Sequence, residues 1–210
     1  MKLYYSPTSP FVRKVLVIAH ELSLADQIEL LASAAHPVDR DANIVAHNPL
    51  GQVPTLLIDE DVALYDSRVI CEYLNHLANG KLFPDEPKRS WLALSQQALS
   101  DGMVAAALAI RYEHTVRPED KRFDKWGFGQ AAKITDGLCM LAVHMQDIQP
   151  FWDIGTISVA CMLSYLDLRF PETKWRDSRP ALASWYAQVC QRPSMAATIL
   201  RDKPVPPAKT

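Results

Sequence analysis

Apolar segments with strand-like spacing are confined to the first 79 residues of this chain, and that limits the folds open to it. Over those residues short apolar runs alternate with amphipathic stretches, whereas the apolar stretches after residue 87 all have helical spacing. The intervening segment is Asn79-Gly80-Lys81-Leu82-Phe83-Pro84-Asp85-Glu86-Pro87, in which glycine and two prolines indicate a linker. The sequence therefore predicts an α/β domain at 1–79, a linker at 80–87 and an all-helical domain at 88–210.

The order of elements follows from the same pattern. In the first domain we expect strand, helix, strand, then strand, strand, helix, over residues 3–5, 10–22, 28–31, 55–59, 62–64 and 66–77. Val15, Ile18 and Ala19 recur at helical spacing, so one face of the first helix can cover a small mixed sheet. In the second domain we expect helices over residues 90–116, 123–146, 155–170, 180–191 and 194–200.

Charge and composition limit the partners of the chain. Its formal net charge of -2 lacks the basic excess of a nucleic-acid binder, so no nucleic-acid partner is expected. Neither a signal peptide nor a membrane-spanning stretch is visible, which favours a cytoplasmic protein without membrane contact. Cys71, Cys139, Cys161 and Cys190 are widely spaced in apolar surroundings and are predicted to be buried thiols. The histidines show no metal-ligand spacing, so no metal is expected.

The segment Ser6-Pro7-Thr8-Ser9-Pro10-Phe11 joins the first predicted strand to the first helix. Ser9 stands where an N-cap belongs, and Pro10 stands at the first helical position, where a missing N–H costs nothing. Such a start is commonly no more than a cap. The same place also offers a hydroxyl donor and the positive end of a helix dipole to an anion.

Two further segments are weak signals when taken alone. Pro54 begins a predicted strand, and a cis Val53–Pro54 bond would free the backbone N–H and C=O of Val53 to pair with an extended peptide. An ordinary turn is the alternative. Asp66 and Ser67 open the next helix, where they cap it or, with its first N–H groups, bind a carboxylate.

In their order and spacing these segments resemble the glutathione-binding domain of the cytosolic glutathione transferases, of the bacterial type with serine in a Ser9-Pro10-Phe11 motif. Asp153-Ile154-Gly155-Thr156 is similar to the N-capping box of that family's C-terminal domain, although Ser or Thr usually comes first and Asp fourth. The resemblance implies a thioredoxin-like α/β N-terminal domain of order βαβαββα, followed by an all-α bundle. Replacing Asp153 with Ala should cost roughly 1 kcal/mol or more, the usual value for losing a cap.

The resemblance also implies a function. Glutathione would be the co-substrate, without a metal, and a homodimer would conjugate its thiolate to small hydrophobic electrophiles in detoxification. Ser9 would be catalytic by hydrogen bonding to the sulfur. Glutathione would be bound by Gln52, Val53, Pro54, Asp66, Ser67 and, across a dimer interface, Asp101. The electrophile pocket, between the domains, would be formed by Phe11, Met103, Ala107, Arg111 and Tyr112.

A hydroxyl donor is needed because a helix dipole alone is too weak. Lowering a thiol pKa of about 8.5 by roughly two units takes about 2.7 kcal/mol. A helix N-terminus contributes about 0.3 to 1 kcal/mol, rising to about 2, and a charge-assisted hydrogen bond about 1.5 to 3. Tyr5 and Thr8 are alternative donors. Two other functions stay open: a non-catalytic transferase-like binding or stress protein, and a glutathione-dependent peroxidase, dehalogenase or isomerase.

Overall fold

The computed structural model describes residues 1–59 and 62–202. Contacts divide the chain into two compact units: Met1–Asp85 with the segment that begins at Gln191, and Glu86–Cys190. The predicted helical domain extended from 88 to 210, so the structure differs from it at the C-terminal end. There, α9 (Pro193–Ala197) packs on α1 (Pro10–Glu21) of the first unit. Residues 203–210 of that predicted domain lie outside the described residues.

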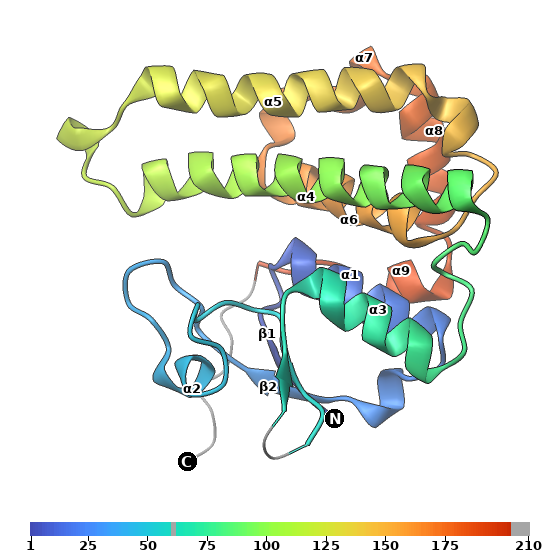
Figure 1. Cartoon of the computed structure of the whole chain (residues 1–210). Helices are drawn as coiled ribbons and strands as arrows, with labels where there is room; N and C mark the ends of the chain where they lie inside the picture. The colour runs from blue at the N-terminus through green and yellow to red at the C-terminus, as the bar shows by residue number, and fades with distance from the viewer. Residues whose placement is uncertain (60–61, 203–210) are drawn as a thin grey trace. The chain divides into compact units, whose positions relative to one another are not determined.

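The first unit is a small mixed sheet with helices (Figure 1). Its strands have the order β2-β1-β3-β4, in which β1 pairs parallel with β2 and antiparallel with β3, and β3 pairs antiparallel with β4. The elements before α9 are β1 Lys2–Tyr5, α1, η1 Ala25–Gln27, β2 Glu29–Ala32, α2 Ala42–Val45, β3 Thr55–Leu57, β4 Ala63–Leu64 and α3 Ser67–Leu77. The thioredoxin-like order βαβαββα is confirmed.

The periodic apolar residues of α1 make the core of this unit. Val15, Ile18 and Ala19 are fully buried, and α1 packs against α3. Leu3 and Leu56, which face each other across β1 and β3, are fully buried as well. Burial of each of these valine, isoleucine and leucine side chains stabilises the fold by about 1.5–3 kcal/mol.

The order βαβαββα implies a helix between β2 and β3, but the apolar pattern did not locate α2, which is too short for a hydrophobic period to show. Its four residues are capped by Asp41, whose carboxylate accepts a hydrogen bond from the Asn43 N–H at 2.9 Å. Ile44 is its one buried residue, so a single apolar side chain ties the helix to the unit. One apolar side chain makes no periodic pattern.

The second unit consists of helices, as predicted. They are α4 Pro87–Thr115, η2 Glu119–Lys121, α5 Asp124–Val143, η3 Met145–Asp147, α6 Ile154–Arg169, η4 Pro171–Thr173, α7 Trp175–Ser178 and α8 Pro180–Val189. Helix α6 is buried on all sides from Ile154 to Leu166 and packs on α4. Helices α4 and α5 form a long hairpin (Figure 1). No prediction covered the short helix α7.

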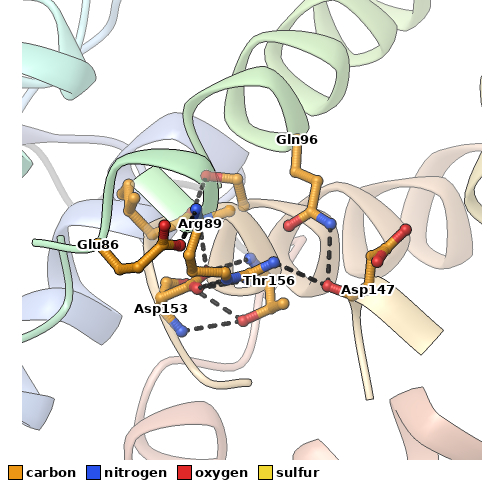
Figure 2. Close-up of polar contacts among 9 residues, drawn as sticks. Glu86, Arg89, Gln96, Asp147, Asp153 and Thr156 are labelled. Carbon is orange, nitrogen blue, oxygen red and sulfur yellow. Dashed lines mark hydrogen bonds and ion pairs between the residues drawn. The ribbon is translucent and has the colours of Figure 1, made fainter. Parts of the chain in front are cut away.

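A cluster of polar groups joins the first turn of α6 to the first turn of α4 (Figure 2). Asp153 caps α6 as predicted: its Oδ1 accepts from the N–H groups of Gly155 and Thr156 at 3.0 and 3.2 Å, and Thr156 Oγ1 accepts from the Asp153 N–H at 3.0 Å. The same carboxylate accepts from Arg89, from Nε at 2.8 Å and also from Nη2. Asp153 and Arg89 are 4% and 8% exposed, so the cap is also half of a buried ion pair.

The prediction of buried cysteines is only partly right. Cys71 and Cys161 are buried, but Cys139 is exposed and Cys190 is half-buried. Cys139 lies on α5, where its sulfur accepts a hydrogen bond from Arg179 Nη2 at 3.1 Å. Apolar neighbours in sequence do not bury a residue that lies on the outer face of a helix. Within the described residues, no helix has both the length and the apolar character needed to cross a membrane.

Candidate functional site

The loop from Ser6 to Ser9 leads from β1 into α1, and Ser9 is the N-cap of that helix, as predicted. Ser9 Oγ accepts from the Val12 N–H at 3.2 Å, the Ser9 carbonyl accepts from the Arg13 N–H at 3.0 Å, and the Ser9 N–H donates to Ser6 O at 3.1 Å. Within residues 1–59 and 62–202 the Ser9 Oγ makes no other hydrogen bond, so its O–H is available to donate. Ser9 is half-buried, so the hydroxyl can reach a ligand.

The two alternative donors are held differently. Thr8 Oγ1 lies 3.2 Å from Ser6 Oγ in a hydrogen bond between neighbouring hydroxyls. Tyr5 belongs to β1, and its carbonyl accepts from the N–H and the Oγ of Ser33 at 3.2 and 3.1 Å. Of the three residues, Ser9 alone is the N-cap of α1.

A hollow of about 120 Å³ opens in the first unit. Its lining residues are Phe11, Asn48, Leu50, Gln52, Val53, Pro54, Tyr65, Asp66 and Ser67. The structure thus brings together the predicted residues of the 52–54 turn, the start of α3 and Phe11, two residues beyond Ser9. Ser9 is not among the lining residues.

The turn before β3 contributes Gln52, Val53 and Pro54 to the lining of this hollow. The Val53–Pro54 bond is cis, which is the geometry that the sequence reasoning considered. In residues 1–59 and 62–202, no hydrogen bond is made by the N–H or the C=O of Val53. Both groups can therefore pair with an extended ligand.

Asn48 braces this turn and was not predicted. Its Nδ2 donates to Thr55 Oγ1 at 2.9 Å and to Gln52 O at 3.3 Å, and its Oδ1 accepts from the Leu50 N–H at 3.0 Å. Asn48 is 1% exposed, so it acts as an internal support. The signal available in the sequence was the Asn-Pro pair, which is typical of turns.

The first turn of α3 carries charge and an available hydroxyl. Asp66 is the N-cap, and its carboxylate accepts from the Arg68 N–H at 2.9 Å and pairs with the Arg68 guanidinium at 3.1 Å. Burial raises the pKa of Asp66, but the hydrogen bonds from Arg68 and the charges of Arg68 and Lys14 outweigh it, so the pKa lies below its usual range. Ser67 is 2% exposed, and its hydroxyl makes no hydrogen bond within the described part of the chain.

Comparison with known proteins places the chain in a family. Residues 8–77 match the family model described as glutathione S-transferase, N-terminal domain. The chain is 30% identical over 202 residues to the uncharacterized GST-like protein YibF of Escherichia coli K12, and the match covers 94% of this chain and 98% of YibF. The chain belongs to the glutathione S-transferase family.

Other members of the glutathione S-transferase family are similar over nearly the whole chain. A family member from Pseudomonas fluorescens Pf-5, solved with bound glutathione, is 41% identical with a TM-score of 0.93, covering 95% of this chain and 98% of that one. A second structure, with bound S-(propanoic acid)-glutathione, is 40% identical with a TM-score of 0.88, covering 96% and 100%. The glutathione S-transferase GstB of Escherichia coli K12 is 27% identical over 201 residues, covering 90% and 92%.

The other residues that were predicted to belong to the site of this glutathione S-transferase family member lie on α4 of the second unit. Met103 and Ala107 are buried, and Met103 packs beside Gly137 of α5, so it takes part in helix packing. Arg111 and Asp101 are half-buried, and none of these residues lines the hollow. Tyr112 is 37% exposed, and burial of its hydroxyl raises its pKa.

Metal-ligating groups of three or more His, Cys, Asp or Glu side chains do not occur among residues 1–59 and 62–202. The polar groups of the hollow are instead a carboxylate, hydroxyls, amides and backbone groups. Such groups bind a polar organic ligand by hydrogen bonds and one charge.

Proposed function

We propose that the chain is a glutathione transferase that binds glutathione in the hollow of the first unit and conjugates its thiolate to small hydrophobic electrophiles. One observation carries the proposal: the unpaired backbone groups of Val53 share a hollow with the ionised Asp66 and the buried Ser67 hydroxyl. Those are the groups that an extended peptide with an amino-acid end requires.

The two ends of glutathione differ in charge, and the hollow offers a different group for each. The γ-glutamyl end carries an ammonium and a carboxylate; Asp66 attracts the ammonium, while Ser67 and the first N–H groups of α3 receive the carboxylate. Val53 pairs with the cysteinyl unit through its backbone, next to Pro54. Gln52, which is exposed at the hollow, reaches the glycine carboxylate. In the proposed homodimer, Asp101 of the partner copy reaches the γ-glutamyl amine.

Ser9 is the group that activates the sulfur. Its O–H donates to the thiolate while its oxygen accepts from the Val12 N–H, and a hydroxyl that accepts a hydrogen bond becomes a better donor. The thiolate then forms a bond to an electrophilic carbon, and the electron pair of the bond that breaks leaves with the departing group. The S-(propanoic acid)-glutathione bound by the Pseudomonas relative supports this, since its sulfur carries an added group.

The residues proposed for the electrophile are Phe11, which lines the hollow of the first unit, and Arg111 and Tyr112, the less buried of those predicted on α4. Met103 and Ala107 would form the packed layer behind them. Detoxification in the cytoplasm is the setting we propose for this reaction. A peroxidase, dehalogenase or isomerase would use the same thiolate on another electrophile.

The proposal is tested by measuring the ultraviolet absorbance of the thiolate of bound glutathione as a function of pH. In the natural protein we expect ionisation near neutral pH, and in Ser9→Ala a pKa near the free value of about 8.5. Thr8→Ala and Tyr5→Phe are the matched controls, each of which removes a neighbouring hydroxyl. Turnover with a reactive electrophile should fall about ten-fold or more in Ser9→Ala, or about 1.4 kcal/mol of transition-state stabilisation.

The outcomes separate the alternatives. A loss of ionisation in Thr8→Ala or Tyr5→Phe, with Ser9→Ala unaffected, moves the activating role to that residue. Glutathione that binds the natural protein without ionising contradicts conjugation and favours a non-catalytic binding protein. Glutathione that does not bind contradicts the assignment of the hollow.

A further inference from the structure

The segment of residues 191–202 returns from the second unit to the first and lies along α1; we name it the C-terminal strap. It contains α9, which packs beside α1 (Figure 1). Hydrogen bonds attach the strap to the last residue of α1, to its first turn and to the loop in front of it. The strap therefore runs antiparallel to α1.

The first attachment is at the C-terminal end of α1. The Glu21 carboxylate accepts from Arg192 Nε and Nη2 at 3.0 and 2.9 Å, a bidentate pair, and from Ser194 Oγ at 2.5 Å. Ser194 is 4% exposed. A bidentate charge-assisted pair fixes the relative orientation of its two partners. This contact therefore fixes the position of the first residues of the strap against α1.

The second attachment is the Arg13 side chain, in the first turn of α1. Its Nη2 donates to Met195 O at 3.0 Å and its Nε donates to Thr198 Oγ1 at 3.4 Å, while Thr198 Oγ1 donates to Ser194 O at 2.8 Å. Arg13 is 5% exposed. Its backbone N–H also donates to Ser9 O at 3.0 Å, so one residue touches both the strap and Ser9.

The third attachment is on the loop that precedes α1. The Arg201 N–H donates to Pro7 O at 3.2 Å, and Pro7 is two residues before Ser9. The strap thus contacts the chain on both sides of Ser9, through Arg13 after it and Pro7 before it. The loop and the first turn of α1 therefore both contact residues of the strap.

We infer that the C-terminal strap is a positioning element, in which Arg13 and the backbone N–H of Arg201 hold the Ser6–Ser9 loop so that Ser9 Oγ donates in a defined direction. The inference rests on the proposed function, in which Ser9 donates to the sulfur of glutathione. Hydrogen bonds prefer donor angles above about 150° and weaken steeply below about 120°, so a rotation of this loop changes how well the thiolate is stabilised. Arg13 and Arg201 need not touch the ligand to have this effect.

The test compares Arg201→Pro with Arg201→Ala in the full chain. Proline removes the N–H that donates to Pro7 O, whereas alanine keeps that N–H and removes only an exposed side chain. Three quantities are measured: hydrogen exchange of the Ser9 and Val12 amides without ligand, the pKa of the thiol of bound glutathione, and the dissociation constant of glutathione. In Arg201→Pro we expect exchange about tenfold faster, as for a segment that has lost one hydrogen bond. We expect the thiol pKa to rise by about 0.5 to 1 unit and the dissociation constant to change less than about twofold. Arg201→Ala should match the natural protein.

Unchanged exchange in Arg201→Pro, or the same change in Arg201→Ala, overturns the strap as a support of the loop. Faster exchange with an unchanged thiol pKa means that the strap stabilises the fold without positioning Ser9, and overturns the inference. If the natural protein forms no thiolate, the proposed function fails and the positioning of a thiolate donor fails with it. If only the inference about the strap is wrong, the natural protein still ionises the thiol of bound glutathione near neutral pH.

Discussion

Asp153→Ala should destabilise the helical unit far more than the loss of a helix cap. The cap contributes about 1 kcal/mol, the value that follows from the sequence alone. The structure adds Arg89, which is 8% exposed and whose guanidinium pairs with the same carboxylate (Figure 2). Removing one partner of a buried ion pair costs about 3–5 kcal/mol, because the other charge is left buried and unpaired. We therefore expect a loss of about 4–6 kcal/mol, against a total stability of about 5–15 for a typical domain.

Urea unfolding of the full chain, followed by circular dichroism, measures this loss. Asp153→Asn keeps an acceptor for the cap and removes the charge, so it isolates the ion pair. Asp147→Ala is the matched control, since Arg89 Nη1 donates to the backbone carbonyl of Asp147 at 2.8 Å and the substitution keeps that carbonyl. It should stay within about 0.5 kcal/mol of the natural protein. The double variant Arg89→Met with Asp153→Ala should lose less than the sum of the single changes.

Two results would refute this reasoning about the ion pair. The first is a loss of about 1 kcal/mol or less in Asp153→Ala, which would leave the cap as the whole effect. The second is strict additivity of the Arg89 and Asp153 changes, which would mean that the two charges are not coupled.

Two other predictions concern the same unit. Gly155→Ala places a Cβ 2.7 Å from the carbonyl oxygen of Ala93, a backbone atom that cannot turn away, and should cost about 1–3 kcal/mol in urea unfolding. Gly102→Ala on α4, with nothing within 4 Å, should stabilise by about 0.5–1 kcal/mol, and equal effects of the two changes would contradict the packing argument. Burial raises the pKa of Tyr165 to about 12, so the folded state keeps its phenol neutral after the unfolded phenol, with a pKa of about 10, has ionised. The contribution of Tyr165 to the free energy of unfolding should therefore be fully present below pH 10 and be lost between about pH 10 and 12. Tyr165→Phe should decline less over that range in urea midpoints, and a parallel decline of the two proteins would show that another group is responsible.

Elements and caps were predictable because they depend on neighbours in the chain. Pro10 after Ser9, and Asp153 three residues before Thr156, mark helix starts because a cap bonds groups within one turn. The apolar period of α1 indicated a buried face before any partner was known. Helix α2, held by one buried side chain, and the outward-facing Cys139 lacked such a local signal.

The candidate site was predictable only in part. The 52–54 turn and the Asp66-Ser67 helix start share one hollow, and the roles assigned to them stay predictions. Asn48, Leu50 and Tyr65 line the same hollow, and nothing in their own sequence pattern indicates a ligand. They belong to the site because the fold brings two turns together.

Pairings between distant residues required the tertiary structure. Arg89 and Asp153 are 64 positions apart, and Arg13 and Met195 are 182 positions apart. An arginine in a helix can donate to any carboxylate or carbonyl that packing brings within reach, so its place in the sequence does not name its partner. Local patterns therefore determined the helices, strands and caps of this chain. The packing of those elements determined which buried charges pair, and which end of the chain supports Ser9.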